Sequence, residues 1–222
     1  MKKQLTNRSL DNPYAFLLQC VNLLVGSRAM LAISTIRLPP GLAKAGHWVF
    51  LTNLSLFITV AYNVLTIVTY ASRSTKLFEL HRYLHLIATV LELTVSTVYW
   101  PLRLWFLHLI AAKGVGIPMS LDLSIHAMPA LTLLLDFYLF LPNWNISKRN
   151  ALALVTTLAY SYWFWLYIKM DETSIYPYPF LNVSTGKRAV IFVVVALVAF
   201  THFLIHRLIH SRLVKAKKIR KD

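Results

Sequence analysis

Two polar residues, Thr52 and His126, lie in separate apolar segments of the chain, each a few residues inside its segment. In a chain that crosses a bilayer, both segments would start from the same face, so the hydroxyl and the imidazole would share one depth near the non-cytosolic interface. A hydroxyl within reach of an imidazole is the arrangement of a nucleophile with a neighbouring general base. These two residues are therefore the first candidates for a catalytic pair.

Two charged residues are candidates for supporting roles beside this pair. Asp122 comes one helical turn before His126 and is expected to accept a ring N–H, leaving the other ring nitrogen free as a base. Arg103 lies beside Trp100 and is expected either to reach the interface or to receive the carboxylate of a lipid.

Each member of the pair also has a purely structural interpretation. A threonine in a membrane helix commonly donates its hydroxyl to a carbonyl one turn earlier, which would leave Thr52 without a chemical role. A buried histidine commonly bonds to a neighbouring helix, and this alternative stays open for His126.

Composition indicates the elements that must position these residues. The chain of 222 residues is 57% hydrophobic, has a mean hydropathy of +0.57 and contains only 8 acidic residues. This composition predicts an all-α polytopic membrane protein, a single domain over residues 1–222. The net charge of +15 does not indicate nucleic acid binding, because the Lys and Arg residues lie in the tails and between apolar segments. Anionic lipid headgroups explain that distribution, so membrane lipids are the expected partners.

Apolar segments of about 20 residues match the thickness of a bilayer and predict a bundle of six transmembrane helices. Pro101 is expected to kink the third of them or to divide it. The distribution of Lys and Arg places both termini in the cytosol, with a tail at 1–13 and a basic tail at 210–222 that continues the last helix. The predicted spans are 14–36, 47–70, 83–111, 120–141, 149–169 and 188–209.

The remaining ionisable residues inside the predicted spans suggest other arrangements. Glu92 and Arg28 fall near the middle of the membrane and Asp136 nearer the cytosol, so an interhelical pair of opposite charges is expected. Five histidines at four-residue spacing offer a competing metal or haem site. Membrane di-iron enzymes need adjacent His-His pairs, which do not occur here, so no cofactor is predicted. The five histidines are His81, His85, His202, His206 and His210.

Three motifs resemble those of a known family in their order and spacing. Trp48-Val49-Phe50-Leu51-Thr52 opens the second span, His126 is followed by Asp136, and Tyr178-Pro179-Phe180-Leu181 lies in the last long loop. Together they look like the family of the androgen-induced protein and the androgen-dependent TFPI-regulating protein. The resemblance covers roughly residues 46–202.

The resemblance implies a six-span transmembrane hydrolase that cleaves fatty acid esters of hydroxy fatty acids. It assigns the nucleophilic threonine to Thr52 and the histidine to His126. Better-known members surround their histidine with Asn-His-Gly, whereas this chain has Ile125-His126-Ala127, so the resemblance does not explain Asp122.

The sequence also suggests oxyanion donors, a location and two rival functions. Candidates for an oxyanion donor are Asn53, Ser55 and Tyr176. The endoplasmic reticulum is the expected location. The rival interpretations are a non-catalytic lipid-binding or scaffold protein and a His-ligated metal-dependent lipid oxidase.

Overall fold

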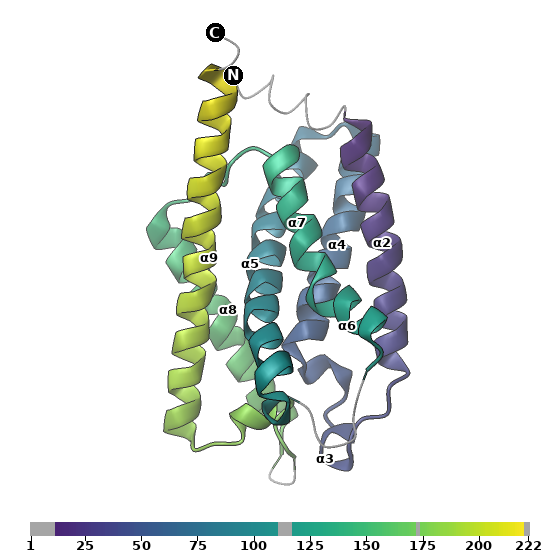
Figure 1. Ribbon diagram of the computed structural model, residues 1–222, viewed down its shortest axis with the longest axis vertical. Coiled ribbons are helices and arrows are strands. Elements are labelled where there is room, and N and C mark those ends of the chain that lie inside the picture. Colours follow the sequence, from purple (N-terminus) through teal and green to yellow (C-terminus); the bar gives the residue numbers. More distant parts are fainter. Residues whose placement is uncertain (1–11, 111–116, 172–173, 220–222) are drawn as a thin grey trace.

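The computed structural model describes residues 12–110, 117–171 and 174–219, and within these ranges it contains helices and no strand (Figure 1). The tails predicted at 1–13 and 210–222 lie partly outside the described residues. The long helices are α2 (Pro13–Ser34), α4 (Leu51–Ser72), α5 (Thr75–Trp105), α6 (Met119–His126), α7 (Met128–Leu139), α8 (Lys148–Lys169) and α9 (Thr185–Ile219). Between them lie α3 (Pro40–Ala43) and three 3-10 turns, His47–Val49, Leu107–Leu109 and Pro179–Leu181.

The predicted class, an all-α polytopic membrane protein, is confirmed. Four helices of the described chain are long and apolar enough to cross a membrane: Pro13–Ser34, Leu51–Ser72, Lys148–Lys169 and Thr185–Lys215. The chain runs alternately up and down the bundle, and the start of α2 and the end of α9 lie at the same end (Figure 1). The count of six crossings and the cytosolic termini stay predictions.

Helix α5 lies at the centre of the bundle and packs against α4, α6, α7 and α9. Its apolar face joins α7, α8 and α9 in a buried core cluster. This central position lets α5 present side chains both to α4 and to α6. The cluster comprises Leu86, Val90, Phe137, Leu141, Trp144, Ala151, Val155, Ala199 and Phe203.

Helix α5 differs from the predicted third span at both of its ends. The helix begins at Thr75, where the Ser74 hydroxyl caps it by accepting from Leu77 N, and not at residue 83. It also continues through Pro101 to Trp105, so the expected division at Pro101 is wrong, and the kink stays a prediction. A proline removes one backbone bond, which a helix packed among neighbours tolerates.

The segment predicted as one span at 120–141 is broken into α6 and α7 at Ala127, whose φ of -124° and ψ of -52° depart from helical values. Pro129 explains the break, because it has no N–H to donate and its ring clashes with the carbonyl four residues earlier. The break makes His126 the last residue of α6. In an unbroken helix, His126 would lie within the ladder of backbone bonds.

Candidate active site

Thr52 is the second residue of α4, which begins at Leu51, whereas the predicted span begins at 47. A 3-10 turn at His47–Val49 and the extended Phe50 precede the helix. Thr52 therefore belongs to the first turn of α4, where backbone N–H groups have no partner within the helix. The side chain is 6% exposed.

The Thr52 hydroxyl does not donate to the carbonyl one turn earlier. The contact that the structural interpretation predicts is therefore absent. Thr52 Oγ1 lies 3.3 Å from the hydroxyl of Tyr178, which comes from the loop after α8. The carbonyl one turn earlier, Trp48 O, instead accepts from the indole of Trp165. Other helical threonines donate to the carbonyl four residues before them: Thr66, Thr69, Thr94, Thr132 and Thr201.

His126 is held from two sides in a single orientation. Its Nδ1 lies 2.8 Å from Asp122 Oδ1, as the one-turn spacing predicted. Its ring stacks on that of Tyr99, with centroids 3.4 Å apart and planes inclined by 4°. Its carbonyl, left without a helical donor at the break, accepts from Trp100 Nε1. With the Nδ1 proton donated to the carboxylate, Nε2 keeps its lone pair and is the nitrogen that can act as a base.

Asp122 links His126 to a cation. Its Oδ2 accepts from Arg103 Nε at 3.1 Å, and the Asp122 side chain is fully buried. The sequence predicted Arg103 at the interface or on a substrate carboxylate, and did not foresee this ion pair. Arginine, carboxylate and imidazole thus form a chain that fixes the imidazole tautomer.

Thr52 and His126 line the same cavity, which has a volume of about 260 Å³. No hydrogen bond joins the two side chains, and His126 Nε2 has no hydrogen-bond partner among the described residues. The imidazole therefore lines the cavity with one ring nitrogen that the described protein leaves unbonded. Two cationic side chains, Arg37 and Arg103, line this cavity as well.

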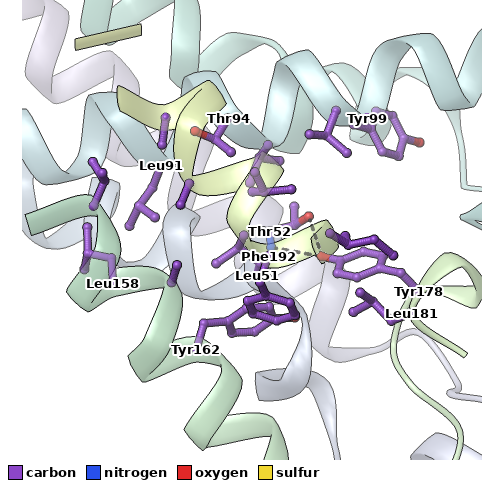
Figure 2. A pocket seen from close by; sticks show the side chains of 18 of the residues that line it. Leu51, Thr52, Leu91, Thr94, Tyr99, Leu158, Tyr162, Tyr178, Leu181 and Phe192 are labelled. Atoms are coloured by element: carbon purple, nitrogen blue, oxygen red, sulfur yellow. Dashed lines mark hydrogen bonds between the residues drawn. The ribbon is translucent and has the colours of Figure 1, made fainter. Parts of the chain in front are cut away.

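Thr52 also lines a second cavity of about 110 Å³, whose walls are almost wholly apolar (Figure 2). Tyr99 and Tyr178 border both cavities. Thr52 therefore lies where a space with cationic walls meets an apolar one. The apolar walls include Leu51, Val90, Leu91, Val95, Val155, Leu158, Ala159, Phe192, Ala196 and Ala199.

The oxyanion candidates named from the sequence direct their polar groups elsewhere. Asn53 Nδ2 donates to His47 O, and Ser55 Oγ donates to Thr52 O. The Tyr176 hydroxyl accepts from Arg188 Nη1. Sequence reasoning placed Tyr178 in a family motif but assigned it no role in the site.

The buried acidic residues do not form the expected pair with Arg28, which is exposed on α2. Glu92 Oε1 lies 3.0 Å from the hydroxyl of Thr59, and Asp136 accepts from the hydroxyl of Tyr62. A cationic partner was expected because it lowers the cost of burial. In the described chain, hydroxyl groups contact these two carboxyl groups in place of a cation.

Most of the histidines of the competing metal site bond to the protein. His85 Nε2 bonds to Leu133 O while its Nδ1 accepts from Trp144, and His210 bonds to Leu141 O. Within the described ranges, no group of three or more His, Cys, Asp or Glu side chains could hold a metal ion. The metal-dependent alternative gains no support from these positions.

The fold and the site together define a polytopic helical membrane protein with a buried polar site where two cavities meet. The family model of the FAR-17a/AIG1-like proteins matches residues 14–211. The chain belongs to this family, and the resemblance seen in the sequence is confirmed.

Two fungal relatives extend the comparison. The chain is 35% identical to the UPF0641 membrane protein YHR140W of Saccharomyces cerevisiae over 217 residues, which cover 88% of this chain and 91% of the relative. It is 28% identical to the UPF0641 membrane protein PJ4664.05 of Schizosaccharomyces pombe over 167 residues, covering 74% and 75% of the two chains. No solved structure matches the chain. The relatives' names state that they are membrane proteins and name no reaction.

Proposed function

We propose that this protein is an integral-membrane hydrolase that cleaves fatty acid esters of hydroxy fatty acids, with Thr52 as nucleophile and His126 as general base. One observation carries the proposal: both side chains line a single cavity, and Asp122 holds His126 through Nδ1, which leaves Nε2 as the basic nitrogen. Membership of the FAR-17a/AIG1-like family supports the same assignment.

The proposed reaction has two acyl-transfer steps. His126 Nε2 takes the proton of Thr52 Oγ1, and this oxygen attacks the ester carbonyl carbon to form a tetrahedral oxyanion. The oxyanion collapses, the bond to the alkoxy oxygen breaks, and His126 returns its proton to that oxygen, which releases the hydroxy fatty acid. Water then loses a proton to His126 and attacks the acyl-threonine. The fatty acid leaves, and the proton returns to Thr52.

The two cavities that meet at Thr52 suit the two halves of such a substrate. The apolar cavity suits the acyl chain, because its walls offer almost no polar group to desolvate. The larger cavity suits the half with the free carboxylate, because Arg37 and Arg103 line it. Arg103 already bonds to Asp122 through Nε, so we assign it a positioning contribution in addition to charge attraction.

The proposal includes a location and a topology. We place the protein in the endoplasmic reticulum membrane with both termini cytosolic, which puts Thr52 and His126 near the luminal interface. The excess of Lys and Arg in the predicted cytosolic segments supports this orientation. The mechanism as written requires no cofactor, and its partners are the lipid ester and the surrounding membrane lipids.

Labelling with a fluorophosphonate probe tests the proposal, because the probe reacts only with an activated nucleophile. Purified wild-type protein should be labelled, and the labelled peptide should contain Thr52 by mass spectrometry. Thr52→Ala and His126→Ala should both abolish labelling. The matched control is Thr201→Ala, since Thr201 donates its hydroxyl to Leu197 O and lines neither cavity. This variant should label like the wild type.

Equal labelling of Thr52→Ala and the wild type would overturn the mechanism. Absence of labelling and of ester turnover in the wild type would favour the rival, a non-catalytic lipid-binding or scaffold protein. Binding of the intact ester without its cleavage would then be the activity to measure.

A further inference from the structure

The first turn of α4 offers backbone N–H groups that the helix itself leaves unused. Phe50 precedes the helix and makes no side-chain cap, while its carbonyl accepts from Asn53 N and Leu54 N. Leu51 and Thr52 are the helical residues ahead of these, and their N–H groups point out of the helix end. The positive end of the helix dipole lies here too, so this position favours a negative oxygen.

The hydroxyl of Tyr178 occupies this position. It accepts from Thr52 N at 3.3 Å and lies 3.3 Å from Thr52 Oγ1 (Figure 2). Burial raises the pKa of Tyr178, so its hydroxyl keeps its proton and remains a donor at neutral pH. Both bonds are long for hydrogen bonds between such groups, so a better acceptor can take them over.

The loop that carries Tyr178 is fixed by contacts that do not involve its hydroxyl. Arg188 donates to Leu181 O, to Val183 O and to the Tyr176 hydroxyl, and its guanidinium lies 3.8 Å from the Tyr176 ring. The Tyr178 ring packs edge-on against Phe50, with centroids 5.8 Å apart. The hydroxyl is therefore held in place before any substrate binds, as electrostatic catalysis requires.

A ligand oxygen in this position would also lie in the cavity that His126 faces. His126 is 6% exposed, its Nε2 has no described hydrogen-bond partner, and it lines the larger cavity together with Thr52 and Tyr178. The nucleophile thus has a base in the same cavity and two hydrogen-bond donors next to it. This is the combination that a tetrahedral intermediate needs.

We propose that Tyr178 is a catalytic residue of this site, and that its hydroxyl and the Thr52 N–H together bind the oxyanion formed on the ester carbonyl. The inference rests on the proposed function. When the ester binds, its carbonyl oxygen accepts from both donors. The Tyr178 hydroxyl then turns its proton from Thr52 Oγ1 to the substrate, and Thr52 Oγ1 becomes available to His126. No proton leaves Tyr178 in this step, which changes only hydrogen-bond partners.

The test compares Tyr178→Phe with Tyr160→Phe in the purified full chain, using a fatty acid ester of a hydroxy fatty acid and its thionoester analogue. Loss of one oxyanion donor lowers kcat by about 10²–10³-fold, and KM should change little. Sulfur accepts hydrogen bonds poorly, so the variant should lose far more activity on the ester than on the thionoester. The ratio of the two rates does not depend on how much of the protein is folded. Tyr160→Phe should leave the ratio unchanged, because Tyr160 is exposed on α8 and lines neither cavity.

Each outcome has one meaning when Thr52→Ala is measured beside these variants. A fall in kcat with a reduced preference for the ester supports the assignment. An equal fall on both substrates would show that Tyr178 only positions the loop, and wild-type rates would show no contribution; either result overturns the inference. If Thr52→Ala retains full turnover, the proposed function itself fails.

Discussion

Replacing Asp122 with Asn removes one charge from the buried chain that orients His126. The 2.8 Å contact between His126 Nδ1 and Asp122 Oδ1 puts the charge centres of an imidazolium and a carboxylate about 4 Å apart. At an effective dielectric constant near 20, the attraction is about 4 kcal/mol. His126 is charged only after it has taken the proton of Thr52, so the loss falls on the transition state and lowers kcat by about 10³-fold. An Asn side chain also offers an N–H to Nδ1, which favours the tautomer with its proton on Nε2.

Turnover of a fatty acid ester of a hydroxy fatty acid by purified Asp122→Asn is the assay, with thermal unfolding measured on the same sample. The fold should survive, because the Asn carbonyl can still accept from Arg103, whose side chain is 29% exposed. Asp171→Asn is the matched control, since Asp171 pairs with Lys44 at the surface and should keep wild-type turnover. Turnover of folded Asp122→Asn within tenfold of the wild type would refute the reasoning.

Two further variants address the apolar cavity and the packing of the bundle. Ala159→Phe should fill part of the apolar cavity and lower kcat/KM for long acyl chains by about tenfold or more while sparing short ones. An unchanged chain-length profile would show that the acyl chain lies elsewhere. Gly26→Val should destabilise the protein by about 1–3 kcal/mol, because a Cβ at Gly26 would lie 3.0 Å from a methyl group of Val60. Gly186→Val, where nothing lies within 4 Å, is the control, and equal unfolding midpoints for the two variants would contradict the packing argument.

The arrangement of helices could be predicted from the sequence because it depends on apolar segments of membrane length. The predicted spans agree with the helices in order and approximate position. Their ends are less well predicted, since local contacts set them. The side chain of Ser74 starts α5 early, and Pro129 breaks the segment that contains His126. The capping serine and the helix-breaking proline are both visible in the sequence, but a hydropathy average does not take them into account.

The candidate site could be predicted in part for a related reason. The contact between Asp122 and His126 follows from one helical turn, so spacing alone predicts it. The contact between Thr52 and Tyr178 joins residues 126 positions apart, and no local pattern specifies it. The ion pair of Arg103 with Asp122 likewise depends on how α5 crosses α6. The assigned chemistry of Thr52 and His126 stays a prediction until the variants are measured.

Because α4 and α5 are joined by a tight turn, the number of residues in each helix determines where its site residues lie. Only Arg73 and Ser74 separate the two helices, and Arg73 adopts the left-handed conformation with φ of 54°. Thr52 and Tyr99 lie at the far ends of this hairpin, each roughly 30 Å or more from the turn at 1.5 Å per residue. One residue inserted within either helix would rotate everything beyond it by about 100° and shift it by about 1.5 Å. An insertion in α5 would move Tyr99 away from the ring of His126. The number of residues between the turn and the site must therefore stay unchanged in each helix for the site to form.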